Sequence, residues 1–181
     1  MIENELLIIA DVNAGHTEKF GLLYDGYFPK IYNYFFYRLK NRQAAEDLTS
    51  VTFIKAIKNI NKFDDRKGDF SAWLYRIARN SLYDYYRTRK HTEQLVETKI
   101  KIEPEDFHKE VLDKEMAEHV QKFLDNLTET QRDMVIMRIW DDLSYREISQ
   151  IIGKSQSGSK MAFYRAIEKL KSIAAPFYAA K

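Results

Sequence analysis

The chain has 181 residues with a net charge of +2, and its 45% apolar and 31% charged residues are typical of a soluble globular protein with one large or two small domains. It contains no cysteine, which excludes disulfides, thiolate zinc sites and cysteine nucleophiles and fits a reducing cytoplasm. Because no run approaches the roughly 18 apolar residues of a membrane span, and the first residues lack the basic region of a signal peptide, we expect a cytoplasmic protein without membrane insertion.

Apolar residues recur at helical spacing almost throughout, and only six glycines and three prolines interrupt them. We therefore predict an all-α fold without strands. In the first half, helices are expected over residues 3–14, 17–39, from about 44 to 60, and 70–90. Gly15 ends the first of these helices, and Asn41 with Arg42 forms a turn. The polar loop 63–69 precedes the fourth helix, and loops of this kind often hold binding elements.

The helix predicted over 70–90 has two faces, with Ser71 as its expected N-cap. Its apolar face contains Trp73, Leu74, Ile77, Ala78, Ser81, Leu82 and Tyr85. Its polar face contains Tyr75, Arg76, Arg79, Asn80, Tyr83, Tyr86, Arg87 and Lys90. Cations among aromatic rings and an amide can neutralise phosphates, stack on unpaired bases and read a base edge. The polar face therefore indicates single-stranded or melted nucleic acid, with a merely solvated amphipathic helix as the alternative.

Charge is distributed unevenly, which places a polyanionic partner on one part of the molecule. Residues 71–90 carry five cations against Asp84 alone, whereas residues 93–118 carry nine acids against four lysines. The apolar period fades after Lys90, so we expect a tether there. The predicted organisation is a first domain over 1–91, an acidic linker over 92–110, a second domain over 111–175 and a tail over 176–181.

The second domain shows clear helix starts. Thr128 with Gln131 and Ser144 with Glu147 have capping-box spacing, and Gly153 ends the helix that follows Ser144. A last helix is expected over 156–172. Its candidate inward positions are Met161, Phe163, Ala166, Ile167 and Leu170, and its cations are Lys160, Arg165, Lys169 and Lys171. Two helices joined by a short turn with glycine indicate a helix-turn-helix, although similar hairpins occur in proteins that never contact DNA.

Three stretches together resemble the extracytoplasmic-function group of bacterial sigma factors, in the sigma-70 family. They are Ala45-Glu46-Asp47-Leu48-Thr49 with Thr52-Phe53, Phe70 through Asn80 with Asp84, and Leu143-Ser144-Tyr145-Arg146-Glu147-Ile148 through Gly153. Their order covers nearly the whole chain. The resemblance implies two small helical domains, a sigma region 2 bundle and a region 4 helix-turn-helix, joined by a flexible linker.

The resemblance also implies roles for individual residues. Recognition of the promoter −10 element falls to Phe63, Asp64, Arg66, Lys67, Tyr75, Arg76, Arg79, Asn80, Tyr83 and Arg87. Recognition of the −35 element falls to Ser155, Lys160, Met161, Tyr164 and Arg165, and docking on core polymerase to Glu46, Asp47 and Ser50. The expected partners are bacterial core RNA polymerase, promoter DNA and an anti-sigma factor. Catalysis then belongs to the polymerase, and the chain directs it to promoters and stabilises the melted −10 element.

Some positions depart from the family pattern. Val51 stands where a glutamate is usual, and Ser159, Ala162 and Ile167 stand where a β-branched apolar residue and two arginines are common. Fewer cations on the last helix predict fewer phosphate contacts and a weaker, less salt-dependent −35 interaction.

Two other functions compete with this interpretation. A sigma mimic would occupy an anti-sigma factor without opening promoters, which Val51 and the few cations of the last helix would suit. An enzyme acting on nucleic acid fits poorly, because His16, His91, His108 and His119 are scattered without metal-ligand spacing. We expect no catalytic residue, metal, cofactor or small-molecule substrate.

Overall fold

The computed structural model describes residues 2, 4–95 and 114–179, and every structural statement below refers to these residues. They form eight α-helices and three short 3₁₀ helices, with no strand among them, which confirms the all-α prediction. No helix in the described ranges has the length and apolarity needed to cross a membrane. The chain divides into two compact units, Met1–Glu103 and Pro104–Lys181.

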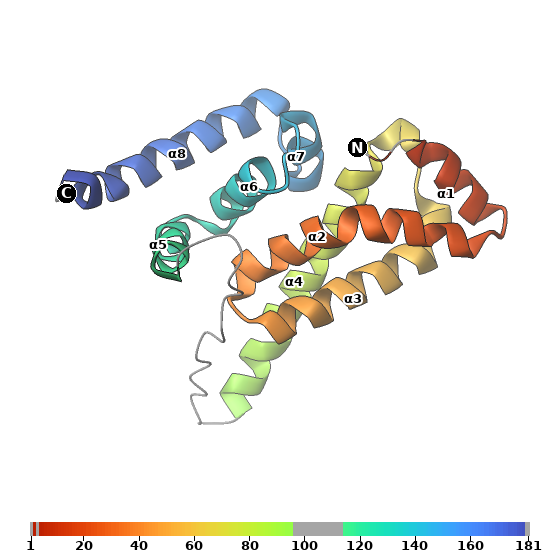
Figure 1. The fold of residues 1–181 in the computed structure, drawn as a ribbon, viewed down its shortest axis with the longest axis horizontal. Helices are drawn as coiled ribbons and strands as arrows, with labels where there is room; N and C mark the ends of the chain where they lie inside the picture. Colours follow the sequence, from red (N-terminus) through yellow and green to blue (C-terminus); the bar gives the residue numbers. More distant parts are fainter. Residues whose placement is uncertain (1, 3, 96–113, 180–181) are drawn as a thin grey trace. The chain divides into compact units, whose positions relative to one another are not determined.

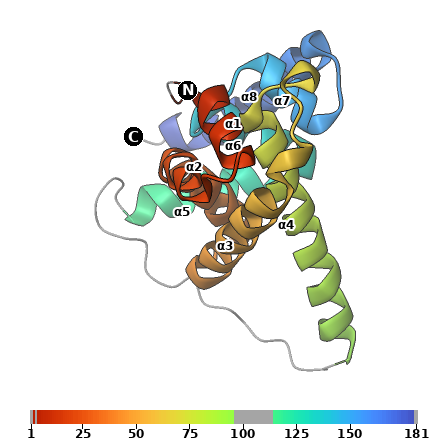
Figure 2. The same cartoon turned by 90° about the vertical axis from the view of Figure 1, so that its right-hand side faces the viewer.

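The first unit contains α1 (Glu5–Asn13), α2 (Phe20–Leu39), α3 (Arg42–Asn59) and α4 (Phe70–Leu95), with 3₁₀ turns at Thr17–Lys19, Ile60–Lys62 and Asp65–Lys67. Helices α2 and α3 form an antiparallel hairpin, and α4 packs against α3 (Figure 1). The C-terminal end of α4 runs past the turn that joins α2 to α3 (Figure 2).

The core of the first unit lies between α2, α3 and α4. Its largest fully buried side chains include Ile31, Tyr34 and Phe35 of α2 and Leu74 and Leu82 of α4. Burial of an aliphatic or aromatic side chain of this size stabilises the folded state by about 1.5–3 kcal/mol. Packing on this scale holds α4 firmly, so that its exposed face is presented on a rigid support.

Helix boundaries differ from the sequence predictions in a few places. The side chain of Asn41 accepts a hydrogen bond from Ala44 N at 2.7 Å, so Asn41 is an N-cap and α3 begins at Arg42, which is not part of a turn. Helix α4 begins at Phe70, where Trp73 N donates to Asp69 O at 3.1 Å. Ser71 is therefore buried inside the first turn, and the prediction that it caps the helix is wrong.

The second unit contains α5 (Lys114–Asp125), α6 (Glu129–Ile139), α7 (Tyr145–Ile152) and α8 (Gln156–Ala179), and α8 packs against the other three helices. Both capping boxes are present, with the Thr128 and Ser144 side chains accepting from the backbone N–H groups of Gln131 and Glu147. Gly153 has φ 75°, the left-handed conformation that favours glycine at a helix C-terminus.

Helices extend into both the predicted linker and the predicted tail. Helix α4 continues to Leu95, so the first four residues of the predicted linker 92–110 are helical, and the remaining residues of the linker lie outside the described ones. The predicted second-domain start at 111 also lies outside the described residues, which resume at Lys114. Helix α8 extends to Ala179 and so passes both its predicted end at 172 and the start of the predicted tail.

Candidate nucleic-acid interfaces

One line of side chains along α4 forms an exposed polar surface, which we call the α4 stripe: Arg76, Arg79, Asn80, Tyr83 and Arg87. Intervals of three and four residues place all of them on one side of a helix. Arg76, Asn80 and Arg87 are exposed, and the guanidinium carbon of Arg79 lies 5.0 Å from the centre of the Tyr83 ring. The stripe thus combines cations, an aromatic ring and an amide, as its sequence indicates.

Tyr75 does not belong to this exposed surface. Its side chain is 0% exposed, and its ring lies 5.7 Å from the Tyr34 ring of α2 in an edge-on arrangement. Three and seven residues after it come Ala78 and Leu82, which are both fully buried. Tyr75 therefore shares their line on the helix, and its predicted place on the polar face is wrong.

The loop before α4 is held by an aromatic cluster at its start and a glycine near its end. The Phe63 ring lies 5.5 Å from that of Phe70 and 5.8 Å from that of Trp73. Gly68 is buried with φ 153° and ψ 175°, a conformation that side chains rarely adopt. The 3₁₀ turn Asp65–Lys67 between them is therefore presented from two anchored ends.

Asp64 organises the cations of this loop. It accepts hydrogen bonds from the Arg66 backbone N at 3.2 Å, Nε at 2.9 Å and Nη2 at 3.1 Å, and Lys67 Nζ lies 3.4 Å away. The Arg66 side chain, the largest influence, lowers the pKa of Asp64 from 3.8 to about 2. The side chains of Arg66 and Lys67 remain more than 80% exposed, so an anion can reach both.

A second carboxylate lies at the edge of the α4 stripe that faces α3. Asp84 accepts a hydrogen bond from Arg87 Nη2 at 2.9 Å, and its other oxygen lies 3.8 Å from Lys55 Nζ. Lys55 also donates to Ser81 Oγ at 3.0 Å, so it spans from α3 to α4. The sequence gives no signal for the role of Lys55, because this contact joins residues 26 and 29 positions apart in the chain.

The predicted polymerase-docking face lies on α3. Glu46 accepts from Arg42 Nε at 2.8 Å, Asp47 accepts from Gln43 at 3.1 Å, and Ser50 Oγ donates to the Glu46 carbonyl at 3.0 Å. Asp47 and Ser50 are exposed.

Two apolar side chains lie on the same side of α3, in helical register with Asp47 and Ser50. Val51 is 38% exposed and Ile54 is 52% exposed. Ile54 is not among the predicted docking residues, although its spacing of four residues from Ser50 puts it in register with the polar positions. The face is therefore mixed polar and apolar, a composition suited to binding another protein.

In the second unit, Ser155 caps the last helix. Its Oγ accepts a hydrogen bond from Gly158 N at 3.1 Å, and its carbonyl accepts from Ser159 N at 2.9 Å. The other four predicted −35 residues, Lys160, Met161, Tyr164 and Arg165, are all exposed along α8. Met161 is 54% exposed, so its assignment as an inward position is wrong while its place on the outer face agrees with the structure.

The four cations of α8 are not equivalent. Lys169 Nζ donates to the Asn126 carbonyl at the end of α5, and Lys171 pairs with Glu168 at 2.9 Å. Lys160 and Arg165 form no ion pair with the described residues. The positive charge available to a ligand of α8 is therefore centred on these two residues of its N-terminal half.

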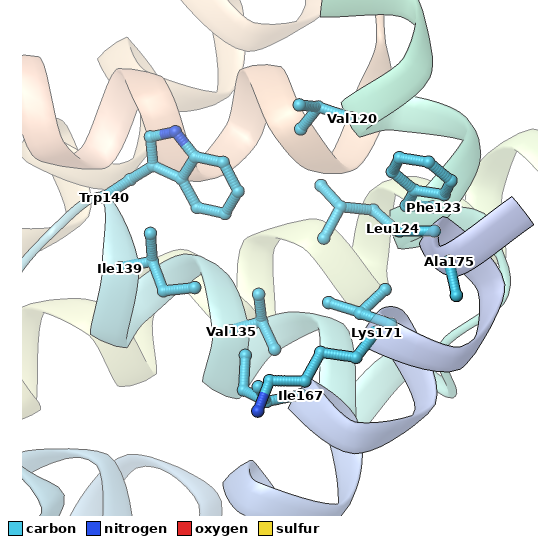
Figure 3. A pocket seen from close by; sticks show the side chains of 11 residues that line it. Val120, Phe123, Leu124, Val135, Ile139, Trp140, Ile167, Lys171 and Ala175 are labelled. Carbon is cyan, nitrogen blue, oxygen red and sulfur yellow. The ribbon is translucent and has the colours of Figure 1, made fainter. Parts of the chain in front are cut away.

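An apolar pocket of about 400 Å³ lies between α5, α6 and the C-terminal half of α8. Figure 3 shows side chains of the three helices converging on it, with the indole of Trp140 at one side. Its lining includes Val120, Phe123, Val135, Ile139, Trp140 and Ile167. Ile139 is half exposed, so apolar surface continues from the pocket to the outside of the unit.

Comparisons with known proteins agree with the two units. The family models for Sigma-70 region 2 and Sigma-70 region 4 match residues 23–92 and 117–170. The chain is 32% identical over 172 residues to the ECF RNA polymerase sigma factor BldN of Streptomyces coelicolor, with 92% of this chain and 64% of BldN covered. It is also 32% identical over 178 residues to the ECF RNA polymerase sigma factor SigW of Bacillus subtilis, with 90% and 92% covered.

A solved structure shares the fold. The sigma factor RpoE of Bartonella quintana, solved in complex with the anti-sigma factor NepR, has a TM-score of 0.69 and 23% identity, with 87% of this chain and 98% of that one covered. The chain belongs to the sigma-70 family. Within that family it is a member of the extracytoplasmic-function group of RNA polymerase sigma factors. Proteins of this class are non-enzymatic transcription initiation factors, with core RNA polymerase and promoter DNA as partners.

Proposed function

We propose that this sigma factor divides promoter recognition between its two units. The α4 stripe and the loop 63–69 hold the melted −10 element, and the N-terminal half of α8 reads the −35 element. The α3 face docks on core polymerase. The α4 stripe, in which Arg76, Asn80 and Arg87 are exposed, is the observation that supports this division most directly.

The chemistry of the first unit suits an opened strand. Arg76 and Arg87 can pair with phosphates, and the half-buried Tyr83 ring offers a surface on which a base can stack. The Asn80 amide both donates and accepts, so it can recognise the edge of an unstacked base. Arg66 and Lys67 lie in the anchored loop that precedes the helix and add two cations there.

The second unit is suited to intact duplex. A helix of a helix-turn-helix fits the major groove, where every base pair presents a distinct pattern of donors and acceptors. Lys160 and Arg165 would supply the charged contacts, and Met161 and Tyr164 the apolar ones. Ser155 keeps its role as N-cap and can donate its hydroxyl hydrogen to a phosphate.

Two further proposals concern the cellular location of the protein and its regulation. The protein acts in the cytoplasm, where core polymerase is found, and an anti-sigma factor holds it inactive. The complex of RpoE with NepR supports the second proposal only by analogy of fold. Affinity capture of the chain from a bacterial lysate, scored for polymerase subunits and for a small anti-sigma protein, tests both partners.

Transcription in vitro tests the main proposal. The chain added to bacterial core polymerase on a genomic template should produce transcripts that start at defined promoters. A stable complex with core polymerase without any promoter-dependent transcript would contradict the proposal, and capture of an anti-sigma factor without polymerase would indicate a sigma mimic.

The variant Asn80→Ala tests the residue-level assignment. It should weaken discrimination among −10 sequences by about 1–3 kcal/mol, the value of a bidentate contact to a base, while binding to core polymerase stays unchanged. Asn33→Ala on α2 removes the same side chain outside the stripe and serves as control. Equal losses of DNA discrimination and polymerase binding would show that Asn80 has a structural role.

A further inference from the structure

Asp84 is the one carboxylate among five cations in residues 71–90. It lies beside the α4 stripe, and its two oxygens face different cations: Arg87 at 2.9 Å on α4 and Lys55 at 3.8 Å on α3. All three side chains are substantially exposed. The arrangement therefore engages Arg87 of the stripe and the neighbouring Lys55 of α3, while leaving both within reach of solvent.

The N-terminal half of the stripe has a different charge balance. Arg76 is exposed and forms no ion pair with the described residues, and Asn80 follows it by one turn. A phosphate that pairs with Arg76 displaces no ion pair among the described residues, whereas a phosphate approaching Arg87 competes with Asp84. The electrostatic attraction of the stripe for a DNA strand is therefore strongest near Arg76, one turn from the Asn80 amide that can recognise a base.

We propose that Asp84 is a specificity-determining residue that suppresses sequence-independent binding of single strands to α4. This inference rests on the proposed function of the stripe. A strand whose base is captured at Asn80 has its register set by that contact. A strand with no matching base can slide to any register that offers cations, and Asp84 offsets the charge of two of these cations, Arg87 and Lys55. Asp84 competes for Arg87 in every complex, but a captured strand keeps its contacts with Arg76 and Asn80, so the wrong complexes lose the larger share of their binding.

Replacing Asp84 by asparagine tests this role, because Asp84→Asn keeps the shape of the side chain and removes its charge. Exposed ion pairs are weak, so release of both Arg87 and Lys55 should raise the affinity for an unrelated strand about two- to thirtyfold. Each released cation should also steepen the dependence of log K on log salt by about 0.7.

The experiment uses the full chain bound to core polymerase and two fluorescent oligonucleotides of equal length. One is the non-template −10 strand of a promoter that the polymerase selects from genomic DNA, and the other is oligo(dT). Asp84→Asn should strengthen oligo(dT) binding more than −10 strand binding, so the affinity ratio falls. Asp25→Asn, an exposed carboxylate of α2, changes the net charge equally and should leave the ratio unchanged.

A second variant tests whether the gain in oligo(dT) affinity depends on Arg87. In Asp84→Asn combined with Arg87→Gln, most of the gain in oligo(dT) affinity should disappear. Weaker binding of both strands by Asp84→Asn, or an equal gain for both, would overturn the inference. If the wild-type complex binds neither strand, the proposed function fails instead, so the two failures are distinguishable.

Discussion

Replacing Ser159 by alanine is expected to stabilise the second unit by about 1–2 kcal/mol. Ser159 is 0% exposed, and its Oγ finds no hydrogen-bond partner among the described residues. A buried hydroxyl left without a partner costs about 1–3 kcal/mol, and alanine is a better helix former than serine by up to about 0.5 kcal/mol. The small void left by one oxygen atom offsets part of this gain.

Urea unfolding followed by tryptophan fluorescence measures this effect. Trp140 is the only tryptophan of the second unit, so the background variant Trp73→Phe makes the signal report on that unit alone. With a slope of about 1 kcal/mol per molar urea for a small unit, the midpoint should rise by about 1–2 M. Ser172→Ala is the control, since Ser172 is exposed on the same helix and donates to the Lys169 carbonyl at 2.8 Å.

The control is expected to change the midpoint little, because its better helix propensity is offset by the lost hydrogen bond. If Ser159→Ala stabilises the unit no more than Ser172→Ala does, the argument from the buried hydroxyl is refuted. The outcome also bears on the family pattern, in which an apolar residue is common at this position. A stabilising effect would show that the serine weakens the helix-turn-helix of this chain.

Three further groups of variants test the remaining assignments. Because Tyr75 is buried against Tyr34, Tyr75→Phe should leave the affinity for a DNA strand unchanged. Tyr75→Ala should lower the free energy of unfolding by about 3–5 kcal/mol. Weaker strand binding by a fully stable Tyr75→Phe would show that Tyr75 contacts DNA after all. The carboxylate of Asp64 has a lowered pKa, so its stabilisation of the loop should be fully present above about pH 4 and disappear as the pH falls towards 2. An NMR titration of Asp64 should give a midpoint near 2 that rises towards 3.8 in Arg66→Gln, and an unchanged midpoint would contradict the pairing. On duplex DNA with the −35 element, Lys160→Gln and Arg165→Gln should each flatten the dependence of log K on log salt by about 0.9, and a slope equal to that of the wild type would exclude a phosphate contact.

The two helix starts with a capping box were predictable from the sequence. The two capping boxes need only residues three positions apart, and both form as predicted. Gly153 likewise ends α7 in the conformation that its sequence position indicates. These features depend on backbone groups within a single turn, so no knowledge of the rest of the fold is required.

Residues at the border between two helix faces were not predictable in this way. Tyr75 lies between the exposed Arg76 and the buried Leu74, and its burial depends on packing against other helices, including Tyr34 of α2, which is 41 residues earlier in the chain. Met161 shows the opposite error, since none of the described helices covers it. Helical spacing fixes the angle of a side chain around its axis, but the neighbouring helix determines which angles are buried.

Ion pairs between different helices could not be predicted from the sequence either. The contact of Lys55 with Asp84 requires α3 and α4 to lie at a particular distance and rotation. The Asp64 contact with Arg66 is local, but in a loop many pairings of similar energy compete, and the backbone path determines which one forms.

The geometry of the loop before α4 has a consequence for how base preference can evolve. Gly68 and the Phe63 ring hold the two ends of the loop, whereas the side chains of Asp65, Arg66 and Lys67 point into solvent. Mutations at the three solvent-facing positions can therefore alter the chemistry offered to a base without rerouting the backbone. Mutations at the two anchors change the path itself and should be eliminated by selection. Under the proposed function, promoter preference would therefore be open to divergence by single-residue steps in this loop, each of which leaves the protein folded.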